Sequence, residues 1–302
     1  MTSGILNVHK SAGMTSFDVV SLVRRGTGVR RVGHAGTLDP AAMGVLVVCL
    51  GQAVRISEYL MELRKTYRAV IKLGIATDTY DAEGSPTFTA DSVDVSRESV
   101  VAVLERFVGE IQQAPPSYSA VKVAGQRAYQ LARKGQQVAL KPRPVVVYRI
   151  DLHRFAQTGA RPGEPPIVEI EVECGKGTYV RSIAHDIGRE LGCGGHLAEL
   201  VRTRVGPFDI DSAVEISALE AAFDSDSWQE MVLPMDCGLA HLPAMTLGVA
   251  DEQDLRHGQA LSLDERGAEG EVRRAYGEDG SLAAIVRYDA SEGAWRPRKV
   301  FG

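Results

Sequence analysis

The chain of 302 residues is long enough for one large domain and a second, smaller one. Its content of 44% hydrophobic and 24% charged residues is ordinary for a soluble globular protein. No apolar run reaches the roughly 18 residues that a membrane-spanning helix needs, and the N-terminus lacks the pattern of a signal peptide. We therefore expect a cytoplasmic protein that does not associate with membranes.

The four cysteines form no C-x-x-C pair, which argues against a disulfide framework and fits reduced thiols. Cys193 and His196 have the spacing of metal ligands, but a second pair of ligands is missing from the sequence. We expect a structural role for both residues and no metal site.

The formal net charge of −5 argues against a generic binder of polyanions, but the charge is unevenly distributed. Residues 1–80 hold ten Lys/Arg and five Asp/Glu, and residues 117–149 hold seven Lys/Arg and no Asp/Glu. Residues 209–242 hold eight Asp/Glu and no Lys/Arg. Such segregation allows a basic face toward phosphates on an acidic protein; the alternative, merely solvated faces, suits the acidic run better than the basic one.

Alternation and capping signals predict the first elements. We expect a strand at residues 5–8 and then a helix capped by Thr15 or Ser16, with an apolar stripe of Phe17, Val19, Val20 and Val23. Further along, the pattern predicts a buried strand at residues 45–50, a helix at 55–62 and a half-buried strand at 65–73.

The glycine-containing stretch from Arg31 to Pro40 stands between these elements and presents one imidazole, His34, and one carboxylate, Asp39. Glycines let the backbone turn tightly or approach a ligand, and a loop anchored by a buried strand can hold a reactive side chain still. The alternatives are structural. Asp39-Pro40 is typical of a helix start with Asp as the N-cap, and a single histidine is more often structural than catalytic.

The remaining chain is predicted to alternate between helices and strands. Helices are expected at residues 100–107, 125–135 and 214–223, strands at 145–148 and 168–173, and a turn at 161–166. The second of these helices lies in the carboxylate-free stretch. After Pro243 the composition changes, and residues 246–302 are predicted to form short strands divided by turns.

The segment Gly175-Lys176-Gly177-Thr178 suggests a phosphate-binding loop, but the required G-x-x-x-x-G-K-[ST] pattern is absent. Arg181 follows in the predicted first turn of a helix, where a positive charge is unfavourable to the helix dipole. Its position therefore suggests a carboxylate partner elsewhere in the chain, although a solvent-facing arginine is the alternative.

Several of these stretches resemble motifs of the tRNA pseudouridine synthase B family. The segment Gly33-His34-Ala35-Gly36-Thr37-Leu38-Asp39-Pro40 looks like the signature loop of that family. Lys65-Thr66-Tyr67-Arg68, the polar segment 77–84, Gly177-Thr178-Tyr179-Val180-Arg181 and residues 192–208 match further motifs. The first motif departs from the family pattern, because His9 and Ser11 replace the usual Asp and Pro beside Lys10. In the last motif, Val201 replaces one Arg.

The resemblance implies an α+β fold with a central mixed, mostly antiparallel sheet flanked by helices and loops. It further implies a catalytic domain at residues 1–240, with a thumb-like basic insertion at about 115–145, and a small β-barrel (PUA-like) RNA-binding domain at 245–302. The implied activity is isomerisation of uridine 55 in the T loop of tRNA to pseudouridine, without metal or cofactor. The implied partner is the T arm of tRNA, with the acceptor end contacted by the C-terminal domain of a monomeric enzyme.

The resemblance also implies roles for individual residues. Asp39 is the expected nucleophile, Arg181 its partner, and Tyr67 the ring that stacks on the base and is a candidate for proton transfer. His34 is expected to fill the space that the flipped nucleotide leaves, and Tyr179 and Leu200 to line the base pocket. Lys10, Gly33 and Thr37 are further expected substrate contacts, with the structural alternative open for Lys10. Contacts to the RNA backbone are expected from Arg127, Arg133, Lys134, Lys141 and Arg143.

Three other functions compete with this one. The chain could be a tRNA-binding or folding factor without activity, against which the intact Asp39, Tyr67 and Arg181 argue. It could be a guide-RNA-dependent relative, but the basic insertion favours direct binding of tRNA. A nucleotide hydrolase is disfavoured by the failed phosphate-loop pattern.

Overall fold

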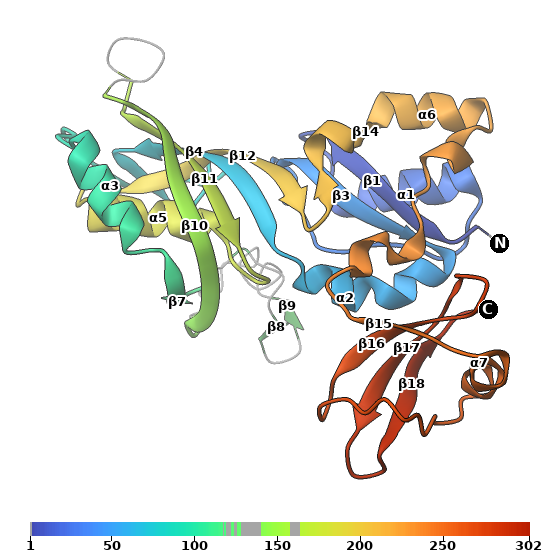
Figure 1. Ribbon diagram of the computed structural model, residues 1–302. Coiled ribbons are helices and arrows are strands. Elements are labelled where there is room, and N and C mark those ends of the chain that lie inside the picture. Colours follow the sequence, from blue (N-terminus) through green and yellow to red (C-terminus); the bar gives the residue numbers. More distant parts are fainter. Residues whose placement is uncertain (1, 117, 119–121, 124–125, 128–139, 158–163) are drawn as a thin grey trace.

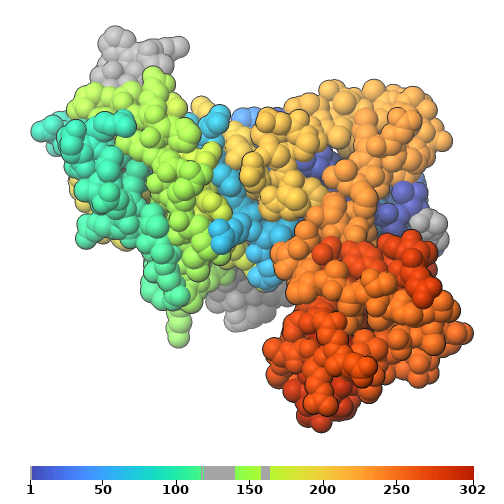
Figure 2. Space-filling model, viewed as in Figure 1, coloured from blue at the N-terminus to red at the C-terminus, as the bar shows by residue number. Residues whose placement is uncertain are grey.

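The structure, a computed structural model, describes residues 2–116, 118, 122–123, 126–127, 140–157 and 164–302. It is an α+β fold built around one mixed sheet, with a smaller four-stranded sheet at the C-terminal end (Figure 1). In the space-filling view the C-terminal part projects from the rest of the molecule as a body of its own (Figure 2). Within the described residues, no helix is both long and apolar enough to cross a membrane.

The large sheet has ten strands and is mostly antiparallel. Its order is β14 (Val214–Glu215), β1 (Gly4–Lys10), β3 (Met43–Leu50), β12 (Gly195–Val205), β4 (Lys65–Leu73), β11 (Ile167–Cys174), β10 (Arg143–Ala156) and β7 (Gly109–Gln113), with β2 (Val32–His34) on β3 and β13 (Phe208–Asp209) on β12. Two short hairpins stand apart from it: β5 (Ile75–Thr77) with β6 (Pro86–Thr89), and β8 (Lys122–Val123) with β9 (Gln126–Arg127).

Helices cover the sheet and close its core. They are α1 (Ser16–Thr27), α2 (Ser57–Glu62), α3 (Arg97–Glu105), α5 (Val180–Glu190) and α6 (Ile216–Asp224), with 3₁₀ turns at Gly51–Ile56, Ile210–Ser212, Trp228–Met231 and Met235–Leu239. Helices α1 and α6 pack their apolar residues on β1 and β3, whereas α3 and α5 pack on the half that contains β4 and β11. Apolar burial on both halves supplies most of the driving force for this arrangement.

Strand β12 joins the two halves of the sheet and thereby assembles the site. It pairs antiparallel with β4 along most of its length and parallel with the start of β3, through Arg202 opposite Gly44. Gly44 has φ of +99°, and a Cβ there would lie 2.2 Å from the carbonyl oxygen of Arg202, so only glycine fits. The loop before β3 is therefore held beside β4 and β12, although these three segments are far apart in the sequence.

The C-terminal sheet runs in the order β15 (Ala244–Thr246), β16 (Val272–Tyr276), β17 (Leu282–Asp289) and β18 (Ala294–Val300), with α7 (Val249–Arg256) beside it. It has its own core around the fully buried Trp295. Its last strand docks on the large part, where Arg55 donates a hydrogen bond to the Val300 carbonyl and Lys299 pairs with Glu58 at 2.9 Å.

The predicted elements are largely confirmed, with five corrections. The strands at residues 5–8, 45–50, 65–73 and 168–173 are present, and Thr15 caps α1 with a reciprocal capping box through Asp18. The helix expected at 55–62 begins with a 3₁₀ turn, the one expected at 100–107 runs instead over Arg97–Glu105, and the one expected at 214–223 begins with strand β14. Residues 126–127 form strand β9 rather than helix, and the rest of that predicted helix lies outside the described residues. Helix α7 interrupts a stretch that was expected to hold strands only.

Phe17 was expected in the apolar stripe of α1, and this was wrong. Val19, Val20 and Val23 are buried, but Phe17 is 64% exposed. At 100° per residue the three valines span about 100° of the helix circumference, and Phe17 lies about 60° outside that arc. The helix therefore turns Phe17 away from the sheet.

Candidate active site

The loop that carries Asp39 is anchored to the turn between β1 and α1. The Ser16 hydroxyl donates to the Leu38 carbonyl at 3.1 Å and accepts from the Leu38 N–H at 2.9 Å. The Gly13 N–H donates to the Pro40 carbonyl at 2.9 Å. These bonds fix the backbone on both sides of Asp39. The helix start that Asp39-Pro40 suggested is absent, because the chain makes one turn there and enters β3 at Met43.

Lys10, which was expected among the substrate contacts, is part of the same anchor. Its side chain is fully buried, and its ammonium donates to the carbonyls of Ser11 at 3.0 Å, Met14 at 2.8 Å and Pro40 at 3.2 Å. Burial lowers the pKa of Lys10 to about 8, against the opposing effect of the Asp39 charge. Of the two roles considered for this residue, the structural one fits, because its three donors are already used inside the fold.

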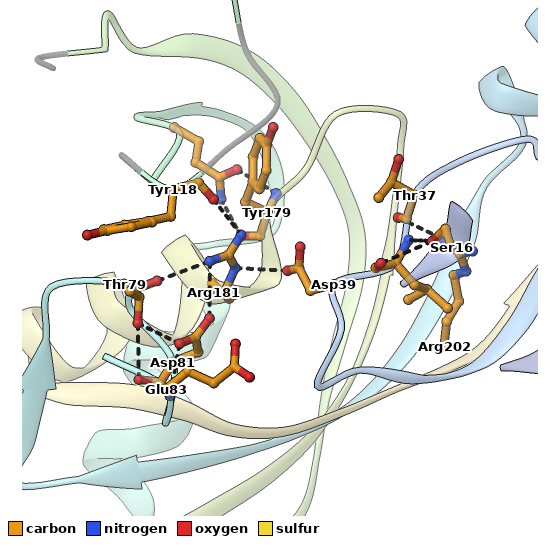
Figure 3. Close-up of polar contacts among 12 residues, drawn as sticks. Ser16, Thr37, Asp39, Thr79, Asp81, Glu83, Tyr118, Tyr179, Arg181 and Arg202 are labelled. Carbon is orange, nitrogen blue, oxygen red and sulfur yellow. Dashed lines mark hydrogen bonds and ion pairs between the residues drawn. The ribbon is translucent and has the colours of Figure 1, made fainter. Parts of the chain in front are cut away.

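Arg202 holds the other side of the loop, and sequence reasoning missed it. It is only 2% exposed; Nε donates to the Val45 carbonyl at 2.7 Å and Nη2 to the Gly36 carbonyl at 3.1 Å. Figure 3 shows it beside Thr37 and Ser16, on the far side of the loop from Arg181. The sequence signal was weak, since an arginine in an alternating strand is usually expected to face solvent.

Asp39 and Arg181 meet as an ion pair, with Nε of the arginine 3.0 Å from Oδ2 of the carboxylate. Arg181 comes from the first turn of α5, and its side chain is 8% exposed, whereas that of Asp39 is 42% exposed. The arginine thus has the carboxylate partner that its helix position suggested. The carboxylate keeps an open side toward solvent, which a catalytic group needs to reach a substrate.

Asp81 is a second carboxylate on the same guanidinium, although no residue of its segment, 77–84, was among the site residues expected from the sequence. Its Oδ2 lies 3.1 Å from Nη1 of Arg181, and its Oδ1 accepts from the Thr79 hydroxyl at 2.5 Å. Arg181 also donates to the carbonyls of Thr79 at 3.3 Å and Tyr118 at 3.0 Å (Figure 3). The arginine is therefore held from several directions and presents only its Nε edge to Asp39.

The groups around Asp39 have opposing effects on the pKa of its carboxyl. Burial raises the pKa of the Asp39 carboxyl above its ordinary value, the Arg181 guanidinium opposes the rise, and the negative charge of Asp81 adds to it. The pKa of the Tyr67 hydroxyl is also raised, chiefly by burial, with Arg202 opposing and Asp39 contributing. At neutral pH the phenol stays protonated and can act as a hydrogen-bond donor or a proton source.

These groups line one cavity of about 860 Å³, toward the upper end of the roughly 300–1,000 Å³ that ligand sites span. Its walls include His34, Thr37, Asp39, Tyr67, Tyr179, Arg181 and Leu200, so the structure brings together most of the residues that the sequence singled out. Gly33 is not among them; it pairs with Cys49 in the sheet. His34 has a buried Nδ1 without a hydrogen-bond partner in the described part of the chain, and burial lowers the pKa of its ring.

Tyr179 is placed by a buried glutamine. Gln113 accepts from the Tyr179 N–H at 2.8 Å and donates to the Tyr179 carbonyl at 3.0 Å. The guanidinium of Arg143 lies 5.3 Å from the centre of the Tyr179 ring and donates to the Gly177 carbonyl at 2.9 Å. Arg143 therefore supports the cavity wall.

Of the other basic residues expected to contact the RNA backbone, the structure describes only some. Lys141 is exposed just before β10. Arg127 lies in β9, and Arg133 and Lys134 lie outside the described residues. No cluster of three or more potential metal ligands occurs within the described ranges; His196 instead bonds through Nδ1 to the Ile75 carbonyl at 2.8 Å.

Comparison with known proteins identifies the family. Residues 24–180 match the N-terminal domain of the TruB family of pseudouridylate synthases, and residues 181–240 match the C-terminal domain of tRNA pseudouridylate synthase B. The chain is 42% identical to tRNA pseudouridine synthase B of Dehalococcoides mccartyi, over 99% of this chain and 96% of the relative. It is 45% identical to the enzyme of that name from Symbiobacterium thermophilum, over 86% and 83%.

Solved structures agree with this assignment. A Cbf5-Nop10-Gar1 complex superimposes with a TM-score of 0.74 at 26% identity, over 99% of this chain and 85% of the other. An H/ACA RNP bound to a substrate RNA containing 2′-deoxyuridine gives a TM-score of 0.73 at 25% identity, with the same coverage of both chains. The chain belongs to the TruB family of pseudouridylate synthases.

Proposed function

We propose that this enzyme converts uridine 55 in the T loop of tRNA to pseudouridine. The observation that carries the proposal is the Asp39–Arg181 ion pair, at 3.0 Å, on the wall of a cavity that Tyr67 also lines. Curated relatives with more than 40% identity over most of the chain are named tRNA pseudouridine synthase B, which supports the choice of tRNA.

The reaction breaks the N1–C1′ bond of the uridine, turns the base and joins C5 to C1′. The proton of C5 is lost and N1 gains one, so substrate and product are isomers and no electrons are exchanged. Asp39 supplies the carboxylate, which either adds to the base or assists cleavage at the ribose. Arg181 aims the carboxylate and opposes the rise of its pKa that burial causes.

The other cavity residues receive roles from their positions. Tyr67 stacks on the uracil and, as a protonated phenol, is the candidate for moving the proton. Leu200 forms an apolar wall of the base pocket and Tyr179 an aromatic one. Thr37, two residues before Asp39 in the same loop, contacts the substrate from the cavity wall. His34, neutral at physiological pH because burial lowers its pKa, fills the space that the flipped nucleotide leaves in the RNA.

Recognition of the RNA is assigned to a basic insertion and to the C-terminal region. The insertion at about 115–145, with Arg127, Arg133, Lys134 and the exposed Lys141, binds the phosphates of the T arm. The region 245–302 is a PUA-like domain that contacts the acceptor end, and residues 1–240 form the catalytic domain. We propose that the enzyme acts in the cytoplasm as a monomer.

A tRNA transcript labelled with tritium at uracil C5 tests the substrate. We expect the enzyme alone to release tritium and to leave pseudouridine at position 55, and a transcript with cytidine at that position to release none. Release that requires a second, guiding RNA would favour the guide-dependent alternative. Tight binding of tRNA with no release would favour the non-catalytic folding factor.

A further inference from the structure

An exposed aromatic ring stands at the rim of the active-site cavity. The described residues include eight large apolar side chains that are exposed, and Phe17, at 64%, is the one among them that lines the cavity. A single exposed apolar residue is ordinary on a protein surface. A ring with this much exposure at the mouth of a cavity that is proposed to hold a nucleotide is different, because flat rings are the groups on which unpaired bases stack.

The ring is carried by a rigid part of the fold. Phe17 follows Ser16, whose hydroxyl is bonded twice to the backbone of Leu38, the residue before Asp39. Thr15 caps the same helix end through a reciprocal box with Asp18. The position of the Phe17 backbone is thus fixed relative to the catalytic carboxylate, so a base stacked on this ring would be held in register with the target nucleotide.

The helix face that presents Phe17 continues as a basic surface. Arg24 lies about 20° from Phe17 around the helix and about 10 Å along it, and Arg25 lies on the adjoining side. Both are exposed, and neither forms an ion pair with a carboxylate in the part of the chain that the structure describes. A strand of RNA leaving the cavity along this face would meet an aromatic ring first and two exposed guanidinium groups next. One of them, that of Arg24, also donates a hydrogen bond to the Val32 carbonyl at 3.3 Å.

We propose that Phe17 stacks on an unpaired base adjacent to the flipped uridine, and that Arg24 and Arg25 bind phosphates farther along the same strand. This inference rests on the proposed function and extends its binding site to the outer face of α1. RNA is the occupant of this face, because the face is continuous with the cavity and carries the charge that complements phosphate.

Removing the ring should weaken binding and spare the chemistry. For Phe17→Ala we expect the Kd for a T-arm hairpin to rise about tenfold to a hundredfold, in line with measured base–aromatic stacking. Phe17→Trp should retain wild-type affinity, whereas Phe17→Leu, which keeps apolar bulk without a ring, should resemble the alanine variant. The rate of a single turnover at saturating RNA should change less than threefold in all three.

A matched control is Phe88→Ala, which removes an exposed ring, 48% accessible, that does not line the cavity. It should leave the Kd unchanged. Hairpins with 2-aminopurine at each position flanking the target give a second readout, since stacking quenches the probe. We expect one position whose quenching by wild-type enzyme is lost with Phe17→Ala and kept with Phe17→Trp. Thermal unfolding verifies that each variant is folded.

Equal affinity and equal quenching for Phe17→Ala and wild type would overturn the proposal, as would a leucine variant that binds like wild type. A change in sedimentation of the alanine variant without a change in RNA affinity would assign the face to a second copy of the chain instead. Absence of pseudouridine from the wild-type reaction would defeat the proposed function itself, an outcome that the Phe17 variants do not affect.

Discussion

Arg181 and Asp81 are joined by an ion pair of 3.1 Å that leaves the Nε edge of the arginine facing Asp39 at 3.0 Å. One guanidinium therefore forms ion pairs with two carboxylates that have different roles. Asp81, which accepts a hydrogen bond from Thr79 and is 14% exposed, holds the arginine; Asp39, which is 42% exposed, is held by it. The arrangement predicts that positioning and chemistry can be separated by mutation.

Asp81→Asn should lower kcat about tenfold to a hundredfold, with KM little changed, because the arginine loses one charge-assisted hydrogen bond worth roughly 1.5–3 kcal/mol. Steady-state kinetics on a T-arm substrate give both constants. An effect confined to KM would mean that Asp81 contacts RNA instead of positioning Arg181.

The same substitution should shift the acid limb of the pH–rate profile. Because the pKa of Asp39 is raised above its ordinary 3.8, kcat/KM of the wild type should fall with decreasing pH at a midpoint above 3.8. The negative charge of Asp81 contributes to that rise, so the midpoint should move to lower pH in Asp81→Asn. A midpoint that moves upward would contradict the electrostatic account.

Asp39→Asn should make the folded protein more stable at neutral pH. A carboxyl whose pKa is raised on folding binds its proton more tightly in the folded state, so its ionisation opposes folding. The penalty is absent below the unfolded-state pKa, near 3.8, and grows to its full size as the pH rises through the folded-state pKa. Thermal unfolding of both proteins across pH should show a higher Tm for the variant at pH 7 and a vanishing difference in acid.

Arg202→Met should lose both stability and rate. Two carbonyls of the catalytic segment, those of Val45 and Gly36, would lose a buried charged donor, at a cost of about 3 kcal/mol. We expect kcat to fall because the Asp39 loop is no longer fixed. Arg204→Met is the matched control on the same strand: Arg204 is exposed and pairs with Asp209 at 2.7 Å, and its loss should cost under about 1 kcal/mol. Denaturant unfolding gives the loss of stability, and steady-state kinetics give kcat. Equal losses in the two variants would contradict the role of Arg202 in fixing the Asp39 loop.

Local pattern predicted the strands well and the polar network poorly. Strand β4 was placed at its observed bounds because alternation of polar and apolar residues is a local signal that burial on one face enforces. Arg181 and Asp81 are 100 residues apart, and Arg202 and Val45 are 157 apart. Neither pairing leaves a trace within a window of ten or fifteen residues, so Asp81 and Arg202 were found only in the fold.

Where local signals and the structure differ, the reason lies in tertiary contacts. Asp39-Pro40 has the composition of a helix start, yet pairing of the next segment with β1 and β12 imposes a strand, so tertiary contacts override the cap signal. Phe17 belongs to the helix periodicity but lies about 60° outside the buried arc, and the sequence cannot locate that arc without knowing where the sheet is. Residues of the signature loop were found through resemblance, since their local pattern favoured structural roles.

Release of tritium from uracil C5 in a single turnover, with saturating enzyme and a T-arm transcript, tests the role of Asp39 most directly. We predict complete release by the wild type and none by Asp39→Asn, while the variant binds the same RNA with wild-type affinity. Release by Asp39→Asn at the wild-type rate would contradict the assignment of this carboxylate as the group that drives the isomerisation.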